Sequence, residues 1–427
     1  MAFILKQIHF FNYTEIEELG DLERLKLVFE GIDDEELMKR IDAKRKNGRD
    51  DYPVRVMWNL YIAMIVFGHK TIASFRRELS RNSQLRRISG LEDGSKKKHL
   101  VPPARVFTNF LKSLEEEQDA IDNIFMEQVS KLQNSISGFG EALAGDGKYL
   151  DSFSKGKSKE VKLDPDNRTE KDAEWSTKEY HYTDANGNKK TKKEHHYGFR
   201  AHIICDIKTE LPVAFTVTAA NVDEKKQMKD LLQNLPEPLK ERAKFIALDR
   251  GYDSKDLITT IKNMGINPVV DIRNCWKDGE ETHQYKNTDI VYDYRGNVYY
   301  VIDAGKKEKM KYQGYDCQKN CLRYSYNDKI YKIYISYDER IFLPIARDSQ
   351  KFKKLYNGRT SVERLNGRLD RDYMFEEHCI RGLNKMKVFL SLSLIIMNGM
   401  AIGKVNQEID SIRSIKTLTN TKKRKTA

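Results

Sequence analysis

The spacing of apolar and polar residues divides the chain into a helical first third and a mixed remainder. From about residue 15 to 135, apolar side chains recur every three or four positions, and glycine and proline are rare inside these segments, which predicts helices. An apolar stripe around Leu60 precedes Gly68, and a second helix is expected from near Thr71. This pattern is typical of two helices joined by a short glycine turn.

From residue 141 onward, short strands are expected to alternate with helices. The stretch "EALAGDGKYLDSF" predicts a strand and turn, and "YGFRAHIICDIKTELPVAFTVTAANVD" predicts two antiparallel strands. A helix, "EKKQMKDLLQNL", precedes the buried strand "KFIALD", the helix "SKDLITTIKNMG" and the strand "INPVVDI". The order β, β, β, α, β, α, β indicates an α/β fold with a ribonuclease-H-like core. The charged stretch at 155–193 predicts a long hairpin or a mobile loop.

Alternating Tyr, Val and Ile between turn residues predict a β-rich insertion, after which helical periodicity resumes at Lys351 and continues to about residue 403. We therefore expect four parts. In chain order these are an all-α N-terminal domain at 1–135, the first part of the core at 136–273, the β-rich insertion at 274–350, and the C-terminal core helices with a basic tail at 351–427.

The 427 residues include 76 Lys and Arg against 64 Asp and Glu, a formal net charge of +12. This excess favours a polyanionic partner such as nucleic acid. No segment resembles a secretory leader, the longest apolar run at 388–397 is too short to span a bilayer, and five cysteines predict no disulfide framework. We expect a cytosolic protein without membrane contact, in which that run forms a buried helix.

Three arginines lie on the helix expected after Gly68, namely Arg76, Arg77 and Arg81. A helix-turn-helix places such a second helix against DNA, so these side chains are candidate DNA contacts. The basic, solvated face of an ordinary helical hairpin has the same pattern, and that alternative stays open.

Two aspartates follow predicted strands, where α/β sheets bind their ligands. Asp249 ends "KFIALD", and Asp146 lies in "LAGDGKYLDSF" among small residues that allow phosphate or metal to approach closely. Asp151 is the nearest alternative to Asp146, and a surface turn is the ordinary role for either. Asp253 suits the cap of the following helix better than Asp249 does, which leaves Asp249 without a structural role.

A third carboxylate, Glu363, lies in "KLYNGRTSVERLNGRLDRDY" on a helix face with other polar residues. That polar face contains Tyr356, Arg359, Glu363, Asn366 and Asp370, beside an apolar stripe of Val362, Leu365, Leu369 and Tyr373. An exposed ion pair between Arg359 and Glu363 is the ordinary alternative and contributes only about 0.3–0.5 kcal/mol. Two strand-end aspartates and a helical glutamate would suit two Mg²⁺ or Mn²⁺ ions for phosphodiester chemistry.

These blocks resemble those of DDE-type bacterial insertion-sequence transposases, in the group with a Tyr-x2-Arg-x3-Glu-x6-Lys signature. "YNGRTSVE" matches the signature at Tyr356, Arg359 and Glu363, while "ALDRGYDS" is similar to the second-aspartate block and "AGDGKYLDSF" to the first. The resemblance covers nearly the whole chain. At the position of the signature lysine, this chain has Asp370.

The resemblance implies that Asp146, Asp249 and Glu363 form the catalytic, metal-binding triad, and that Tyr356 and Arg359 contact phosphates near the cut end. It implies a transposase that binds the ends of its mobile element and cuts and joins double-stranded DNA, acting as a homodimer. The cofactor would be Mg²⁺ or Mn²⁺, bound as two ions. No Gly-rich phosphate loop with Lys-Ser/Thr is found in the sequence, so we expect no nucleotide cofactor.

Further candidate DNA contacts are Arg364 and Arg368 around the glutamate, and Trp276, which would stack on an unpaired base. Packing is the ordinary role of such a tryptophan. Two alternatives to a transposase stay open: a metal-dependent nuclease of the same fold without strand transfer, and a catalytically inactive DNA-binding derivative.

Overall fold

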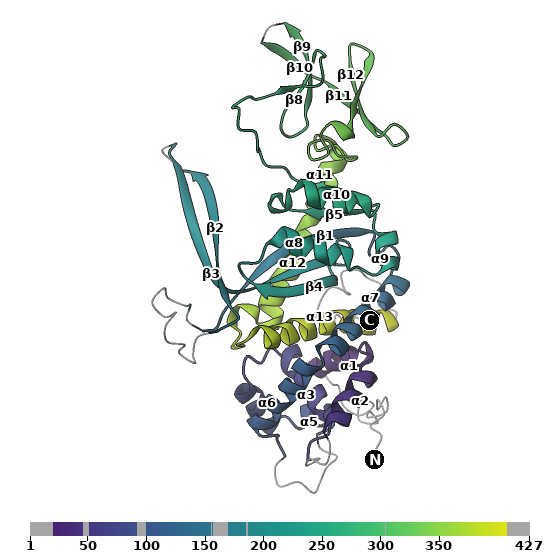
Figure 1. Ribbon diagram of the computed structural model, residues 1–427. Helices are drawn as coiled ribbons and strands as arrows, with labels where there is room; N and C mark the ends of the chain where they lie inside the picture. The colour runs from purple at the N-terminus through teal and green to yellow at the C-terminus, as the bar shows by residue number, and fades with distance from the viewer. Residues whose placement is uncertain are drawn as a thin grey trace, which may run out of the picture.

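A computed structural model gives the fold as a mixed α/β structure (Figure 1). A group of helices, a central sheet with helices on its faces, and two small sheets follow one another along the molecule. The basic tail expected at the end of the chain lies outside the described residues. The structure describes residues 20–45, 51–91, 100–154, 156, 170–184, 187–303 and 305–407.

Helices form the first part of the described chain. They are α1 (Glu23–Glu30), α2 (Glu35–Lys44), α3 (Val54–Val66), α4 (Ile72–Arg81), α5 (Ser83–Ile88), α6 (Ala104–Glu116) and α7 (Gln118–Ser135). The turn expected between α3 and α4 is present: Gly68 has φ +62°, and Thr71 caps α4 by accepting a hydrogen bond from the Ser74 amide at 3.0 Å. Within the helical region expected at about 15–135, Glu117 leaves helical geometry and separates α6 from α7.

A six-stranded mixed sheet forms the centre of the molecule. Its strands are β1 (Ala142–Asp151), β2 (Glu174–Thr183), β3 (Lys189–Asp206), β4 (Pro212–Ala219), β5 (Phe245–Leu248) and β6 (Asn267–Val270). The order is β2-β3-β1-β5-β6, and β4 also pairs with β3. β1 is antiparallel to β3 and parallel to β5, and β2 with the first half of β3 projects as a long hairpin (Figure 1).

Six helices accompany this sheet. They are α8 (Glu224–Gln233), α9 (Glu237–Arg242), α10 (Lys255–Asn263), α11 (Gln350–Tyr356), α12 (Thr360–Tyr373) and α13 (Leu383–Asn406). The pattern predicted α8, α10 and helical structure from Lys351 to about residue 403, but not α9 or the break between α11 and α12. α8 and α12 lie on opposite faces of β1. A Cβ on Gly145 would lie 2.8 Å from Met228 of α8, whereas the side chain of the next residue, Asp146, accepts a hydrogen bond from Asn366 of α12. Successive residues of a strand point to opposite faces of the sheet.

Short strands between β6 and α11 form a four-stranded and a three-stranded sheet, as the alternating pattern predicted. They are β7 (His283–Gln284), β8 (Ile290–Tyr292), β9 (Val298–Asp303), β10 (Lys306–Lys309), β11 (Lys311–Asp316), β12 (Cys321–Tyr326) and β13 (Lys329–Tyr334). They share a hydrophobic core of their own. Two arginines connect this segment to the central sheet: Arg340 pairs with Asp253 at 2.7 Å, and Arg347 donates to the Val270 carbonyl at 2.9 Å.

α13 packs between the first helices and the central sheet (Figure 1). Its length and composition would allow it to cross a membrane, but 89% of its most apolar stretch is buried inside the structure, as in the core helix of a folded domain. The Gln128 side chain of α7 donates to the Gly31 carbonyl at 3.0 Å and to the Ile395 carbonyl at 3.1 Å. One buried amide therefore connects α7, the end of α1 and α13.

Gly403 allows α13 to touch α1, because a Cβ there would lie 2.4 Å from the Leu27 carbonyl oxygen. We expect Gly403→Ala to lower the free energy of unfolding by about 1–3 kcal/mol, the usual cost of overpacking. Gly367 of α12 is the matched control, since no heavy atom lies within 4 Å of its Cβ position, and Gly367→Ala should stabilise by about 0.5–1 kcal/mol. Urea unfolding followed by circular dichroism measures both, and a neutral Gly403→Ala would contradict this packing.

Candidate catalytic site

Asp146 and Asp249 lie at neighbouring positions on two parallel strands. The register of β1 and β5 places Gly145 opposite Leu248, so the residues that follow are adjacent and face the same side of the sheet. That side is the one covered by α11 and α12, where Ala247 packs against Phe352 of α11. The two aspartates therefore meet beneath the segment that carries the third predicted carboxylate.

The surroundings of Asp146 disfavour its negative charge. The pKa of its carboxyl is raised to about 7, chiefly by burial and also by the nearby carboxylates of Asp249 and Glu224, while the hydrogen bond from the Gly147 amide and the charge of Arg359 oppose the rise. Glu224 begins α8 and is an acid that the sequence analysis did not single out. An excess of negative charge is thus held close to Asp146.

Tyr252 adds an unpaired hydroxyl to this cluster. Its side chain is 1% exposed, and within the described residues its Oη has no hydrogen-bond partner. Burial and the charges of Asp146, Glu224 and Asp249 raise its pKa well above the usual value. The hydroxyl would lie 3.3 Å from a Cβ on Gly147, so a residue with no side chain is needed there. The sequence analysis did not single out Tyr252, although its position in "ALDRGYDS", three residues after Asp249, could have pointed to it.

α12 lies along β1 on the face of the two aspartates. The Asn366 side-chain amide donates to Asp146 Oδ2 at 3.4 Å, and one turn later Asp370 accepts from Lys148 Nζ at 2.6 Å. Asp146 and Lys148 are two residues apart on one strand and so share a face. Glu363, which precedes Asn366 by three residues on α12, is placed at the same edge.

Glu363 forms the ion pair that was the ordinary alternative for it. Arg359 Nη1 donates to Glu363 Oε1 at 2.6 Å, and the glutamate side chain is 47% exposed. Tyr356 ends α11, and a short 3-10 turn, Asn357–Arg359, joins it to α12, so the signature residues lie on consecutive helices rather than on one. Arg359 lies over the Tyr356 ring, 5.8 Å from its centroid.

The donors suit Mg²⁺ or Mn²⁺ in chemical type. In the described part of the chain, no group of three or more His, Cys, Asp or Glu side chains is arranged around a common point. Asp146 and Asp249 share an edge, and the raised pKa of Asp146 marks negative charge that a divalent cation would balance. Glu363 would join them only by exchanging Arg359 for the cation.

Two expectations about these aspartates were wrong. Asp146 does not end its strand, because β1 continues to Asp151. Asp249 does have a structural role, because its Oδ1 accepts from the Gly251 amide at 2.6 Å and caps the turn that follows β5. Asp253 does not cap α10; it accepts from Arg340 at 2.7 Å and from the Arg273 amide at 2.9 Å. The insertion, which lies far along the sequence, supplies the arginine that binds Asp253.

Two candidate phosphate contacts around Glu363 are bound to the turn between β3 and β4. Arg364 pairs with the Glu210 carboxylate at 2.7 Å, and Arg368, which is 8% exposed, donates to the Glu210 carbonyl. Trp276 stacks on His283 with ring centroids 3.7 Å apart. These three side chains therefore have packing or structural contacts within the chain.

The arginines of α4 differ in exposure. Arg76 donates to the Pro102 carbonyl at 2.8 Å, and Arg81 pairs with Glu78 of the same helix at 2.5 Å. Arg77 and Arg81 are exposed, whereas Arg76 is partly buried. The exposed face of α4 is thus basic at two positions.

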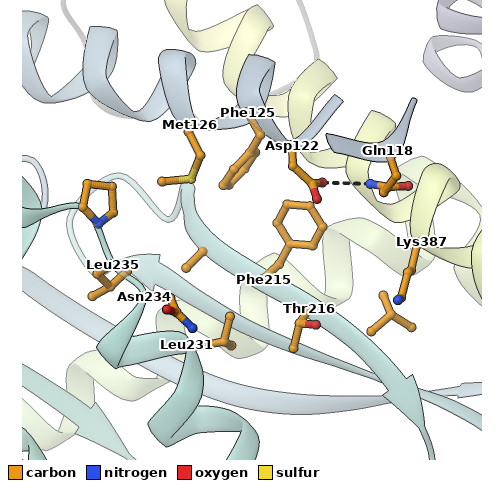
Figure 2. Close-up of a pocket in the computed structure, with 13 residues that line it drawn as sticks. Gln118, Asp122, Phe125, Met126, Phe215, Thr216, Leu231, Asn234, Leu235 and Lys387 are labelled. Atoms are coloured by element: carbon orange, nitrogen blue, oxygen red, sulfur yellow. Dashed lines mark hydrogen bonds between the residues drawn. The ribbon is translucent and has the colours of Figure 1, made fainter. Parts of the chain in front are cut away.

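A cavity of about 290 Å³ lies elsewhere, between α7, β4 and α8 (Figure 2). Apolar side chains such as Phe125 and Phe215 line much of it, and Gln118 donates to Asp122 at its rim at 2.8 Å. None of the three predicted catalytic carboxylates lines this cavity. It therefore does not belong to the candidate site.

Comparison with known proteins gives one family. Residues 163–398 match the family described as "Transposase DDE domain", a segment that includes Asp249 and Glu363 but not Asp146. The solved structure described as "Cryo-EM structure of piggyBac transposase synaptic complex with hairpin DNA" aligns over 93% of this chain and 78% of that chain, at 14% identity and a TM-score of 0.39. A likeness at that score carries no argument. No curated protein matches the chain.

Ionisation of Asp146 is expected to cost stability, because its carboxyl has a higher pKa in the folded chain, about 7, than its ordinary 3.8. The folded chain then binds the proton more tightly, so this carboxyl lowers stability progressively as pH rises from about 4 to about 7. In EDTA, Asp146→Asn should unfold with a free energy roughly 2–4 kcal/mol above wild type at pH 8 and near wild type at pH 4. Urea unfolding at both pH values tests this, and an equal difference at the two would contradict it.

Proposed function

The chain belongs to the transposase DDE domain family, and from that premise we propose that it binds the ends of its mobile element and catalyses metal-dependent cleavage and strand transfer of DNA. The observation that carries the proposal is the position of Asp146 and Asp249 on neighbouring parallel strands, beneath the helix of Glu363. Asp249 directly follows β5, at the edge where an α/β sheet binds its ligand, and Asp146 lies beside it within β1.

We also propose that the central sheet is a ribonuclease-H-like core. The antiparallel pairing of β3 with β1 and the parallel run β1-β5-β6 support it. The element order β1, β2, β3, β4, α8, α9, β5, α10, β6 also supports it, since it is the expected order with β2 and α9 added. The proposed domains keep the expected boundaries: a helical DNA-binding domain at 1–135, core segments at 136–273 and 351–427, and an insertion at 274–350. The separate hydrophobic core of the insertion supports the last boundary.

In the proposed site, Asp146, Asp249 and Glu363 hold two Mg²⁺ or Mn²⁺ ions. Such ions would activate water or a 3′ hydroxyl and stabilise the leaving oxygen of the phosphodiester. The protein contributes the position of these carboxylates on β1, after β5 and on α12. Asn366, which already donates to Asp146, orients that carboxylate.

Arg359 is proposed to bind the phosphate at the cut end. Its guanidinium is paired with Glu363 and is within electrostatic reach of Asp146. A guanidinium that leaves Glu363 can bind phosphate oxygens bidentately. Exchange of the arginine from carboxylate to phosphate would free Glu363 for the cation. Tyr356 lies at the same end of α12, close to Asp249, and is proposed as a second phosphate contact.

We propose double-stranded DNA as the partner of the basic exposed surfaces, among them the face of α4 that carries Arg77 and Arg81. The net charge of +12 supports a polyanionic partner. The chain is proposed to act as a homodimer, since two element ends must be cut together, and to act in the cytosol.

A catalytically inactive DNA-binding derivative is the second candidate. The pairing of Glu363 with Arg359, and the lack of a three-carboxylate group among the described residues, favour it. It predicts binding of element ends without cleavage under any divalent cation.

Substitution of Asp146 and Asp249 tests the catalytic proposal. Asp249→Ala and Asp146→Ala should each lower Mg²⁺- or Mn²⁺-dependent cleavage of a duplex containing the DNA that flanks the coding region by roughly 10³-fold or more, because each removes a cation ligand. Gel analysis of labelled duplex measures the cut. Asp151→Ala is the matched control on β1, since this exposed residue pairs with His196 and should leave cleavage intact.

A pre-cut duplex incubated with supercoiled plasmid then separates a transposase from a nuclease. Joined product in the absence of nucleotide triphosphate is expected from the full-length wild type. Cleavage without any joined product would favour the nuclease, and binding without either reaction would favour the inactive derivative.

A further inference from the structure

Lys148 and Asp370 form an ion pair between β1 and α12 that the proposed chemistry has not used. Lys148 Nζ donates to Asp370 Oδ2 at 2.6 Å, and the two side chains are 14% and 20% exposed. A pair so withdrawn from water gains little net stability, because the cost of desolvating both charges offsets their attraction. Its presence calls for a role beyond joining a strand to a helix.

The pair lies next to the candidate catalytic edge. Lys148 follows Asp146 by two residues, so both side chains leave the same face of β1 about 7 Å apart along the strand. Asp370 follows Asn366 by one turn of α12, and Asn366 contacts Asp146. The ammonium group is therefore the next charged group along β1 from the first catalytic carboxylate.

The pair is incompletely satisfied. An ammonium group has three N–H donors, and Asp370 is the one hydrogen-bond partner of Lys148 in the part of the chain that the structure describes. Asp370 Oδ1 is buried and likewise has no partner among those residues. The ammonium thus keeps donors for a ligand while one carboxylate oxygen holds it in place.

The sequence departs from the signature at this place. The signature that the chain resembles has a lysine at position 370, on the helix, and here that position carries the opposite charge. The structure pairs this aspartate with a lysine that comes from the facing strand. An ammonium group is therefore present between β1 and α12, but it belongs to Lys148 of the strand and not to position 370 of the helix.

We propose that Lys148 binds a DNA phosphate beside the cut end and that Asp370 is the positioning residue that holds its ammonium group. This inference rests on the proposed function. The ligand class is a phosphodiester oxygen of the element end, which a lysine binds as a compact point charge. The exchanged pair thus restores the positive charge that the helix position lacks.

The first measurement compares Lys148→Ala with wild type on a duplex containing the flanking DNA. Cleavage per folded molecule should fall roughly 10- to 100-fold, as expected for loss of a charged hydrogen bond. The slope of log binding constant against log salt concentration should become shallower by about 1, because one phosphate contact is lost. The matched control is Lys240→Ala: Lys240 is 19% exposed and pairs with Glu237 on α9, which precedes β5 and so lies away from Asp249.

Two double variants then distinguish two roles of Lys148: supplying a positive charge for the phosphate, and neutralising the buried carboxylate of Asp370. Lys148→Ala with Asp370→Lys returns the ammonium group from the helix, and we expect it to recover at least about tenfold of the lost cleavage. Lys148→Ala with Asp370→Asn removes both charges and should not recover it. Thermal unfolding of each variant provides the folded fraction used to normalise the rates.

Three results would overturn the inference: wild-type cleavage and an unchanged salt slope in Lys148→Ala, failure of the Asp370→Lys variant to recover cleavage, or equal recovery by the Asp370→Asn variant. The last result would mean that the pair acts only by neutralising a buried carboxylate. If the wild type binds the duplex without cutting it, the proposed catalytic function fails, and the salt slope of Lys148→Ala alone decides whether the lysine contacts phosphate.

Discussion

The pairing of β1 determines most of what this molecule can do. β1 is antiparallel to β3 on one side and parallel to β5 on the other, so it joins the two halves of the sheet. Because the parallel register brings Gly145 opposite Leu248, Asp146 and Asp249 must lie side by side. A slip of one residue would turn one of the two carboxylates to the opposite face of the sheet.

The electrostatics of the site follow from that closeness. Like charges and burial raise the pKa of Asp146, and the unpaired hydroxyl of Tyr252 lies among the same carboxylates. On the opposing helix, Arg359 is paired with Glu363, and Asp370 with Lys148. Both cationic side chains are thus paired with an acid next to the place where a metal ion and a phosphate would bind. When these ligands bind, the arginine and the lysine would contact phosphate, and Glu363 would contact the metal ion.

Packing on either side of the sheet supports this arrangement. α13 is buried against the first helices, and the apolar stripe of α12, from Val362 to Tyr373, is buried as its periodicity predicted. The insertion contacts the central sheet through Arg340 and Arg347, and Arg340 binds Asp253, the residue directly after the turn that Asp249 begins. The position of Asp249 therefore depends on residues almost a hundred positions further along the chain.

The sequence by itself determined the local features: the helices and strands, the turn at Gly68, the β-rich insertion and the three acids, because periodicity and turn chemistry act over a few residues. Only the tertiary structure decided which charges meet. No local pattern could show that Arg364 and Arg368 bind Glu210, or that Asp253 binds Arg340 rather than capping α10. The lysine missing at position 370 was visible in the sequence, but its partner Lys148 became apparent only when α12 lay along β1, since 222 residues separate the two.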